Sequence, residues 1–293
     1  MTGAPPCAPP DFAPRRPGLR LPALACDCHA HILGPAARFA YSPQRIYTPP
    51  DCLLPDYRAM LAAIGAERAV LVQPSVYGTD NAVLLEALRE GGAAFRGVAV
   101  VSDAPGEAQL ESLHAASVRG VRVNVVDVRE GQGSLPVARL RDLAARIAPL
   151  GWHLELLAHV DAYPDLDGDL GGLPVDLVFG HLGYLRTDKG LADPGFRALL
   201  RLAAEGRAWV KLTGPYRIST RPMPHGDVTP FAHALLEHAP DRVVWGSDWP
   251  HVMVKGAMPN DGDLADLLAA WVPDEALRRR VLVENPARLY AFP

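Results

Sequence analysis

Residues 23–32 read ALACDCHAHI, a short apolar run that ends in two histidines separated by one residue. Its length is typical of a β-strand. Further runs of roughly five to nine residues recur along the chain, and most carry Val, Leu or Ile on both alternating faces. They are Arg68–Gln73, Gly97–Ser102, Gly120–Val125, Trp152–Leu157, Val175–His181, Ala208–Thr213 and Arg242–Ser247. The sequence therefore predicts eight strands that are buried on both sides.

The segments between these runs have apolar residues at three- and four-residue spacing, which is the pattern of an amphipathic helix. Eight strands alternating with helices are typical of a (β/α)8 barrel of the TIM type. We therefore predict an α/β fold with a single such barrel over residues 23–293. The expected helices are Tyr57–Ile64, Asn81–Glu90, Glu107–Ser117, Val137–Leu150, Phe196–Ala204, Pro230–Glu237 and Asp263–Trp271, with Glu275–Val283 and Asn285–Tyr290 closing the ring.

Residues 1–22 contain repeated prolines, with Arg15, Arg16 and Arg20 among them. Proline fixes φ and removes a backbone donor, so neither a helix nor an inner strand is expected there. The stretch also lacks the apolar core of a signal peptide. We predict a proline-rich N-terminal arm that is either loose or lies across the body or across a partner subunit.

Composition limits the classes of partner. Hydrophobic types make up 49% of the 293 residues, and the net charge of −4 argues against a nucleic-acid-binding protein, which usually shows a basic stripe. No stretch approaches about 18 uninterrupted apolar residues, so no membrane span is expected. The four cysteines, Cys7, Cys26, Cys28 and Cys52, are expected to be reduced thiols in a cytoplasmic protein, which would be a monomer or a homodimer.

Polar residues at strand ends mark the expected site. Residues two apart in a strand face the same side, so His29 and His31 should point together. His181 ends the sixth run, and Asp248 follows the eighth in the stretch WGSDWPH. Barrels of this type place their chemistry at the carboxyl ends of the strands. We therefore expect three imidazoles and one carboxylate to meet at one mouth of the barrel.

This set suits two kinds of chemistry. The four groups can bind one zinc ion and leave a position for water, or, without metal, they can polarise a carbonyl while the carboxylate takes a proton from water. In both cases Asp248 is the candidate general base, although an Asp before a turn also commonly caps a loop. His251 is either a second proton carrier or a surface residue. Lys211 and Glu155 are either structural ion partners or catalytic groups, and the structural interpretation is favoured.

Arginines and hydroxyls add a second signal. Arg122 lies inside the fourth run, and a buried arginine needs an anionic partner. That partner is either a nearby Asp or Glu or a substrate carboxylate, which a guanidinium binds with two hydrogen bonds. Arg129 and Arg217 follow the fourth and seventh runs. Ser75 and Tyr47 either donate hydroxyls to the same ligand or serve as a turn and a packing residue.

Three stretches together resemble a known family: DCHAH at 27–31, GHLG at 180–183 and WGSDWPH at 245–251. They are similar to the amidohydrolase-2 branch of the amidohydrolase superfamily, and within it to the 2-pyrone-4,6-dicarboxylate lactonases. The resemblance spans residues 23–290 in order. It extends to YTP at 47–49, QPS at 73–75, RGVRVN at 119–124, KLTGPYRIS at 211–219 and MPNDGDL at 258–264.

The resemblance implies hydrolysis of a carboxylated cyclic ester in the breakdown of aromatic acids. Asp248 would then activate water. The histidines His29, His31 and His181 would polarise the lactone carbonyl, and the carboxylates would be held by Arg122, Arg129, Arg217, Ser75 and Tyr47. The lactonases work without a bound metal, whereas many relatives hold zinc. We therefore expect no required cofactor or, failing that, one zinc ion on His29, His31, His181 and Asp248.

The chain departs from the lactonase pattern at Tyr184, where the pattern has Arg, and at Val252 and Met253, where it has Pro and Asn. The missing cation and amide favour a lactone with one fewer carboxylate or a different ring, such as a muconolactone-type acid. Two alternatives stay open. One is a zinc-dependent decarboxylase or amide hydrolase of the same superfamily. The other is a barrel that binds a small acid without turnover, against which the intact histidine and aspartate set argues.

Overall fold

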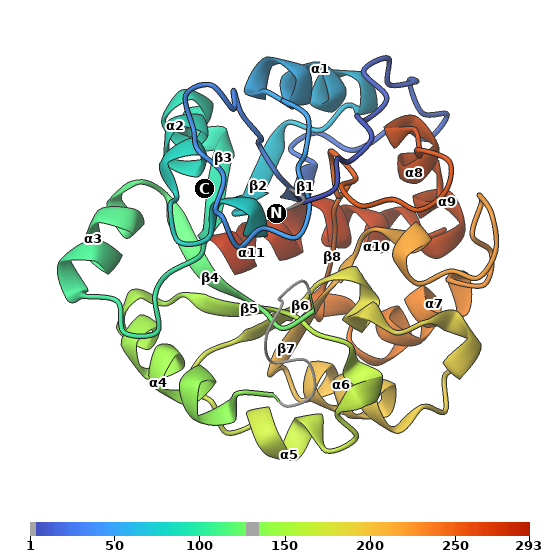
Figure 1. Ribbon diagram of the computed structural model, residues 1–293. Coiled ribbons are helices and arrows are strands. Elements are labelled where there is room, and N and C mark those ends of the chain that lie inside the picture. Colours follow the sequence, from blue (N-terminus) through green and yellow to red (C-terminus); the bar gives the residue numbers. More distant parts are fainter. Residues whose placement is uncertain (1–3, 127–134) are drawn as a thin grey trace.

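A computed structural model of the protein describes residues 4–126 and 135–293. Eight parallel strands form one sheet in the order in which they occur in the chain. Helices surround this ring of strands (Figure 1). The strands are β1 Cys26–Ala30, β2 Arg68–Val72, β3 Phe95–Ala99, β4 Val118–Asn124, β5 His153–Leu157, β6 Leu177–Phe179, β7 Ala208–Leu212 and β8 Val243–Trp245.

The ring nearly closes between its first and last strands. Ala30 of β1 pairs in parallel with Trp249, four residues beyond the end of β8. The amide of His31 donates to the Trp249 carbonyl at 2.8 Å, and the amide of Asp248 donates to the His29 carbonyl at 2.9 Å. The predicted (β/α)8 barrel is therefore confirmed, and the closing hydrogen bonds lie at the rim where the sequence places the histidines.

The helices follow the predicted alternation, and α6 shows why they form. The Asp193 side chain caps its amino end by accepting from the amides of Gly195 and Phe196, and Pro194 occupies the first turn. Its apolar face then buries Phe196 and Leu199. The helices are α1 Leu54–Ile64, α2 Ala82–Gly91, α3 Glu107–Ala115, α4 Val137–Ile147, α5 Leu166–Leu170, α6 Pro194–Ala204, α7 Thr229–His238, α8 Asp261–Asp266, α9 Leu268–Trp271, α10 Glu275–Arg279 and α11 Asn285–Tyr290.

Both faces of the strands are buried, as predicted. Every residue of β1, β2, β3, β5 and β7 is buried, because one face fills the barrel interior and the other packs against the helices. The strand β3 begins at Phe95, two residues before the predicted start, since Phe95 pairs with Ala69 of β2.

The described part of the arm, residues 4–22, lies on the body of the protein. The Cys7 amide donates to the Thr48 carbonyl at 2.8 Å, and the Thr48 amide donates to the Pro5 carbonyl at 2.7 Å. Farther along, Arg15 forms ion pairs with Asp263 and Asp266 of α8, at 2.6 and 2.5 Å. The arm therefore connects the segment between β1 and α1 with α8. No helix in the described ranges is long and apolar enough to cross a membrane.

Candidate active site

Three histidine rings lie together at the carboxyl ends of the strands. His29 lies in β1, His31 directly follows that strand, and His181 follows β6. The ring centroids of His29 and His31 are 5.0 Å apart, and those of His29 and His181 are 5.2 Å apart. All three side chains are buried. The predicted convergence of three imidazoles is what the structure shows.

Asp248 completes the group from the other side. It follows β8 in a left-handed conformation with φ 68°, which Asp adopts more readily than most residues. Its Oδ2 accepts hydrogen bonds from the Tyr216 hydroxyl and from Nε of Arg217, both at 2.6 Å. Its Oδ1 has no hydrogen-bond partner among the described residues and lies 3.7 Å from Nε2 of His29. One carboxylate oxygen is thus fixed, and the other faces the histidines.

The charges around Asp248 keep it ionised. Burial alone would raise the pKa of this carboxyl, but Arg217, His181 and His29 hold the pKa well below its ordinary value. Burial also raises the pKa of the Tyr216 phenol well above its usual range. The hydroxyl therefore keeps its hydrogen and donates it to the carboxylate.

His31 is fixed in one tautomer. Its Nδ1 lies 2.7 Å from the Val72 carbonyl, which can only accept, so Nδ1 carries the hydrogen. Burial, followed by the nearby His29 and Arg122, holds the pKa of His31 well below its ordinary value. The ring is therefore neutral, and its Nε2 presents a lone pair.

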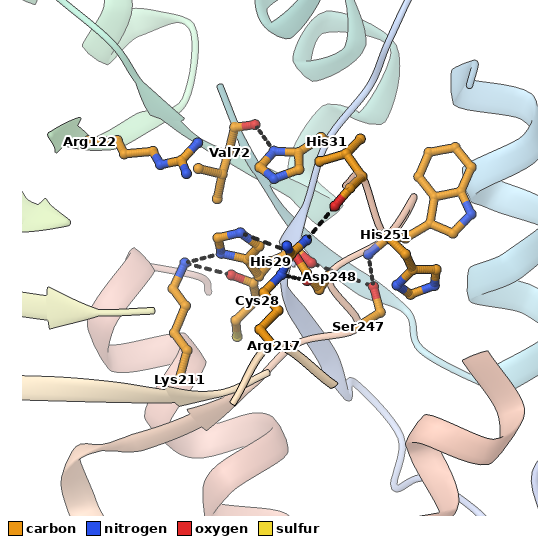
Figure 2. Close-up of polar contacts among 12 residues, drawn as sticks. Cys28, His29, His31, Val72, Arg122, Lys211, Arg217, Ser247, Asp248 and His251 are labelled. Atoms are coloured by element: carbon orange, nitrogen blue, oxygen red, sulfur yellow. Dashed lines mark hydrogen bonds and ion pairs between the residues drawn. The ribbon is translucent and has the colours of Figure 1, made fainter. Parts of the chain in front are cut away.

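His29 lies between Asp248 and the ammonium group of Lys211 inside the barrel (Figure 2). Lys211 of β7 donates from Nζ to Glu155 of β5 at 2.6 Å and to the Cys28 carbonyl at 2.9 Å. The Nδ1 atom of His29 is 3.5 Å from Glu155 and 3.3 Å from Lys211. Burial and the Lys211 charge lower the pKa of His29. The ion partners interpreted from sequence are thus paired, and both also contact a ring of the site.

A small cavity, with a volume of about 20 Å³, opens beside these groups. This volume corresponds to about one water molecule. Arg122, on its wall, donates to the Gln73 carbonyl at 3.0 Å and forms no ion pair within the described part of the chain. The nearby acid that sequence reasoning considered as its partner is therefore not found there. The predicted residues on the wall are His31, Tyr47, Ser75, Arg122, His181, Arg217 and Asp248, whereas Arg129 lies outside the described residues.

The amidohydrolase family matches residues 26–292 of the chain. The chain belongs to the amidohydrolase family. It is 38% identical over 292 residues to a 4-sulfomuconolactone hydrolase of Rhizobium radiobacter, covering 99% of this chain and 97% of the relative. It is 37% identical over 286 residues to a 2-pyrone-4,6-dicarboxylate hydrolase of Comamonas testosteroni, covering 94% and 93%. A solved structure of a candidate 2-pyrone-4,6-dicarboxylic acid hydrolase from Pseudomonas putida superposes with a TM-score of 0.80 at 34% identity, covering 93% and 99%.

The residues that depart from the lactonase pattern line the cavity of this amidohydrolase. Tyr184, Val252 and Met253 are all on its wall, together with Leu157. The Tyr184 ring packs edge-on against His181, with the centroids 5.3 Å apart. At these three positions the cavity wall thus carries one aromatic ring and two apolar side chains.

Sequence reasoning missed part of the amidohydrolase site. Tyr216 was not singled out, although its hydroxyl contacts Asp248, because no spacing rule predicts how far a loop tyrosine reaches. His251 is fully buried, so the interpretation of it as a surface residue is wrong. Its Nδ1 lies 3.0 Å from the Tyr216 hydroxyl, and its Nε2 lies 3.1 Å from Oδ1 of Asp261.

Three of the four predicted metal-binding groups could share an ion. One ligand atom each from His29, His31 and Asp248 lies within 4.8 Å of the others, and His181 is not part of this group. Among the described residues, Nε2 of His29 and Oδ1 of Asp248 have no hydrogen-bond partner, and Nε2 of His31 carries no hydrogen. These atoms make a nitrogen and oxygen donor set that suits a divalent transition metal. The residues present therefore fit a metal of the kind that the superfamily often uses.

Proposed function

We propose that the protein hydrolyses a lactone that carries an acidic group, with Asp248 as the general base for the attacking water. The observation that carries this proposal is the different environment of the two oxygens of the Asp248 carboxylate. Its Oδ2 is held by Tyr216 and Arg217, and its buried Oδ1, beside the histidines, has no partner in the described part of the chain. The similarity to hydrolases of two different acidic lactones supports the choice of reaction.

The roles of the rings follow from their hydrogens. His31 presents a lone pair at Nε2, so it is suited to accept a hydrogen from the attacking water rather than to donate to a carbonyl. His181 lines the cavity, and its Nδ1 has no partner within residues 4–126 and 135–293, which makes His181 the candidate donor to the lactone carbonyl, with His29 beside it. Oδ1 of Asp248 would take the water proton as the new C–O bond forms. The ring C–O bond then breaks, and its oxygen receives the proton.

The acidic group of the substrate is assigned to Arg122. This guanidinium is buried, and its described hydrogen bond goes to a carbonyl, so an anion in the cavity would supply the missing charge partner. Tyr47 and Ser75 are proposed to donate hydroxyls to the same ligand, and Arg129 and Arg217 to add positive charge. The apolar wall at Val252 and Met253 favours a substrate with fewer acidic groups than 2-pyrone-4,6-dicarboxylate, such as a muconolactone-type acid.

A second candidate is a metal-dependent hydrolase or decarboxylase of the same superfamily, which the grouping of His29, His31 and Asp248 favours. These residues would hold one divalent ion. When bound, such an ion supplies a water of lowered pKa and polarises the substrate oxygen. In either case Asp248 lies at the centre of the site.

Hydrolysis of a panel of lactones tests the proposal. The panel contains 2-pyrone-4,6-dicarboxylate, 4-sulfomuconolactone and muconolactone, each assayed with and without chelator while the metal content of the protein is measured. We expect at least one acidic lactone to be hydrolysed and the rate to persist with chelator. Loss of the rate with chelator and its return with zinc would favour the metal-dependent candidate. Tight binding of the acids without turnover would show a binding protein instead.

A further inference from the structure

A buried row of polar groups leads away from Oδ2 of Asp248, the oxygen that does not face His29. The Tyr216 hydroxyl is 2.6 Å from Oδ2 of Asp248 and 3.0 Å from Nδ1 of His251. Nε2 of His251 is 3.1 Å from Oδ1 of Asp261, the first residue of α8. The side chains of His251 and Asp261 are fully buried, and neither lines the cavity. Three residues from three segments thus form one continuous chain that ends on the candidate base.

The hydrogens of this chain can be assigned by counting donors. Asp248 is ionised and accepts, so the single hydrogen of the Tyr216 hydroxyl lies between the two oxygens. The phenol oxygen must then accept from Nδ1 of His251, because two lone pairs at 3.0 Å would repel. The remaining hydrogen lies between Nε2 of His251 and Asp261. The Tyr216 hydroxyl and Nδ1 of His251 therefore both donate in the direction of Asp248.

The cost of burying these groups argues that they do more than fill space. A buried carboxylate or imidazole is stable only when it is hydrogen-bonded, and apolar residues of similar volume are often as favourable. Oδ1 of Asp261 contacts His251, and Oδ2 of Asp261 has no hydrogen-bond partner among the described residues. A chain that leaves one oxygen of Asp261 unsatisfied but firmly holds Oδ2 of Asp248 is better explained by its effect on Asp248 than by stability.

We propose that Tyr216, His251 and Asp261 are positioning residues that fix the orientation of the Asp248 carboxylate. The inference rests on the proposed role of Asp248 as the base. Arg217 already donates to Oδ2 through Nε, and a second donor from a different direction prevents rotation of the carboxylate about its Cβ–Cγ bond. Asp261 orients the His251 ring, the ring orients the Tyr216 hydroxyl, and the hydroxyl fixes the plane in which Oδ1 meets water.

A double-mutant cycle on Tyr216 and His251 tests the chain. We expect Tyr216→Phe to lower kcat about 10- to 100-fold with KM changed less than about threefold, since small misplacement of a catalytic group costs on this scale. His251→Leu should lower kcat similarly, and the double variant should be no worse than Tyr216→Phe alone, because both break one chain. His251→Asn, whose amide can still donate toward Tyr216, should recover most of kcat.

The control is Asp263→Asn in α8. Asp263 has a half-exposed side chain that pairs with Arg15, and it is not part of the hydrogen-bonded chain from Asp261 to Asp248. It should leave kcat unchanged. Independent effects that multiply in the double variant, or a rise in KM without a fall in kcat, would overturn the proposal. Thermal unfolding of each variant identifies any loss of rate that comes from loss of folded protein.

A second readout needs no substrate. In protein labelled with ¹⁵N at histidine, we expect a slowly exchanging hydrogen on Nδ1 of His251 that is lost in Tyr216→Phe and kept in Asp263→Asn. If the parent protein lacks this slowly exchanging hydrogen, the proposed hydrogen-bonded chain is wrong, regardless of which substrate the enzyme hydrolyses. Its presence in a protein that hydrolyses no lactone would refute the proposed function and leave the hydrogen-bonded chain in place.

Discussion

Buried charges in this barrel have two different arrangements, as Arg122 and the pair of Glu155 and Lys211 show. Glu155 and Lys211 satisfy each other at 2.6 Å. Arg122 has no such partner in the described chain, and its guanidinium lies on the cavity wall. At the scale of single residues, the first arrangement holds the barrel interior and the second is open to a ligand.

For Arg122→Met, we expect KM for an acidic lactone to rise about 10- to 100-fold, with kcat changed less than about threefold. The reason is the loss of a charged hydrogen bond, which contributes about 1.5–3 kcal/mol. Steady-state kinetics check this, with Arg146→Met in the last turn of α4 as a control outside the site. An unchanged KM would mean that Arg122 serves the fold and not the ligand.

For Glu155→Gln, we expect a loss of about 3–5 kcal/mol in the free energy of unfolding, because Lys211 would be left buried without its counter-charge. Urea unfolding measures the change. The double variant Glu155→Leu with Lys211→Met removes both charges and should be more stable than the single variant. A single variant as stable as the parent protein would show that the pair is not needed to keep Lys211 buried.

The sequence predicts the residues whose position follows from strand periodicity and strand ends. His29 and His31 are two apart in one strand, so their common direction follows from the backbone. Tyr216 and His251 lie in turns after strands, where a side chain's direction depends on local dihedral angles such as the φ of 58° at His251. No periodic pattern reports such angles, so these contacts required the structure.

At the scale of elements, the segment between β7 and α7 is held by one carboxylate. Asp227 accepts from the hydroxyls of Thr187 and Ser219, both at 2.5 Å, and from the Thr220 amide at 2.8 Å. The same segment carries Tyr216 and Arg217 to Asp248. A single side chain therefore ties the end of this segment to its middle and to Thr187.

For Asp227→Asn, the loss of stability should depend on pH. Burial would raise the pKa of Asp227, but the Ser219 and Thr187 hydroxyls lower it from 3.8 to about 2 in the folded state. The ionised group thus stabilises the fold above about pH 4, and this contribution is lost as the pH falls toward 2. We expect a difference of about 1–2 kcal/mol from the parent at pH 7 that narrows below pH 4. Urea unfolding across this range would contradict the account if the difference stayed constant.

Most elements could be predicted from the sequence, and the exceptions are short or interrupted. The helix α5, Leu166–Leu170, was missed because its sequence LDGDL is only one turn long and too rich in Gly and Asp to show a helical period. The predicted helix 263–271 is two helices, α8 and α9, that meet at Leu267. Hydrophobic spacing continues across this break, so spacing alone does not reveal it.

At the scale of the whole molecule, the arm contacts the two sides of the cavity. The arm pairs with Thr48, which follows the wall residue Tyr47. The Cys7 thiol of the arm accepts a hydrogen bond from the backbone amide of Met253, another wall residue. It then crosses to α8, where Arg15 is anchored (Figure 1). The fold of the barrel could be predicted from eight apolar runs, whereas the path of the arm could not, because its prolines specify extension but no destination.

Deletion of residues 1–9 should therefore raise KM for the lactone roughly three- to tenfold, with most of kcat kept, because Tyr47 and Met253 lose a neighbour that fixes them. Steady-state kinetics compare this truncation with Arg20→Ala, an exposed change in the part of the arm that remains. A truncated protein with the KM of the parent would show that the arm does not support the cavity wall.

The central claim is that groups from distant parts of the chain meet at one rim and hydrolyse an acidic lactone through Asp248. The most direct measurement is the turnover of the best lactone by Asp248→Asn, with binding of the same acid measured by calorimetry. We predict that kcat falls about 10²- to 10⁴-fold, as expected for loss of a general base, and that the acid still binds. A variant that turns over at nearly the parent rate would contradict the claim.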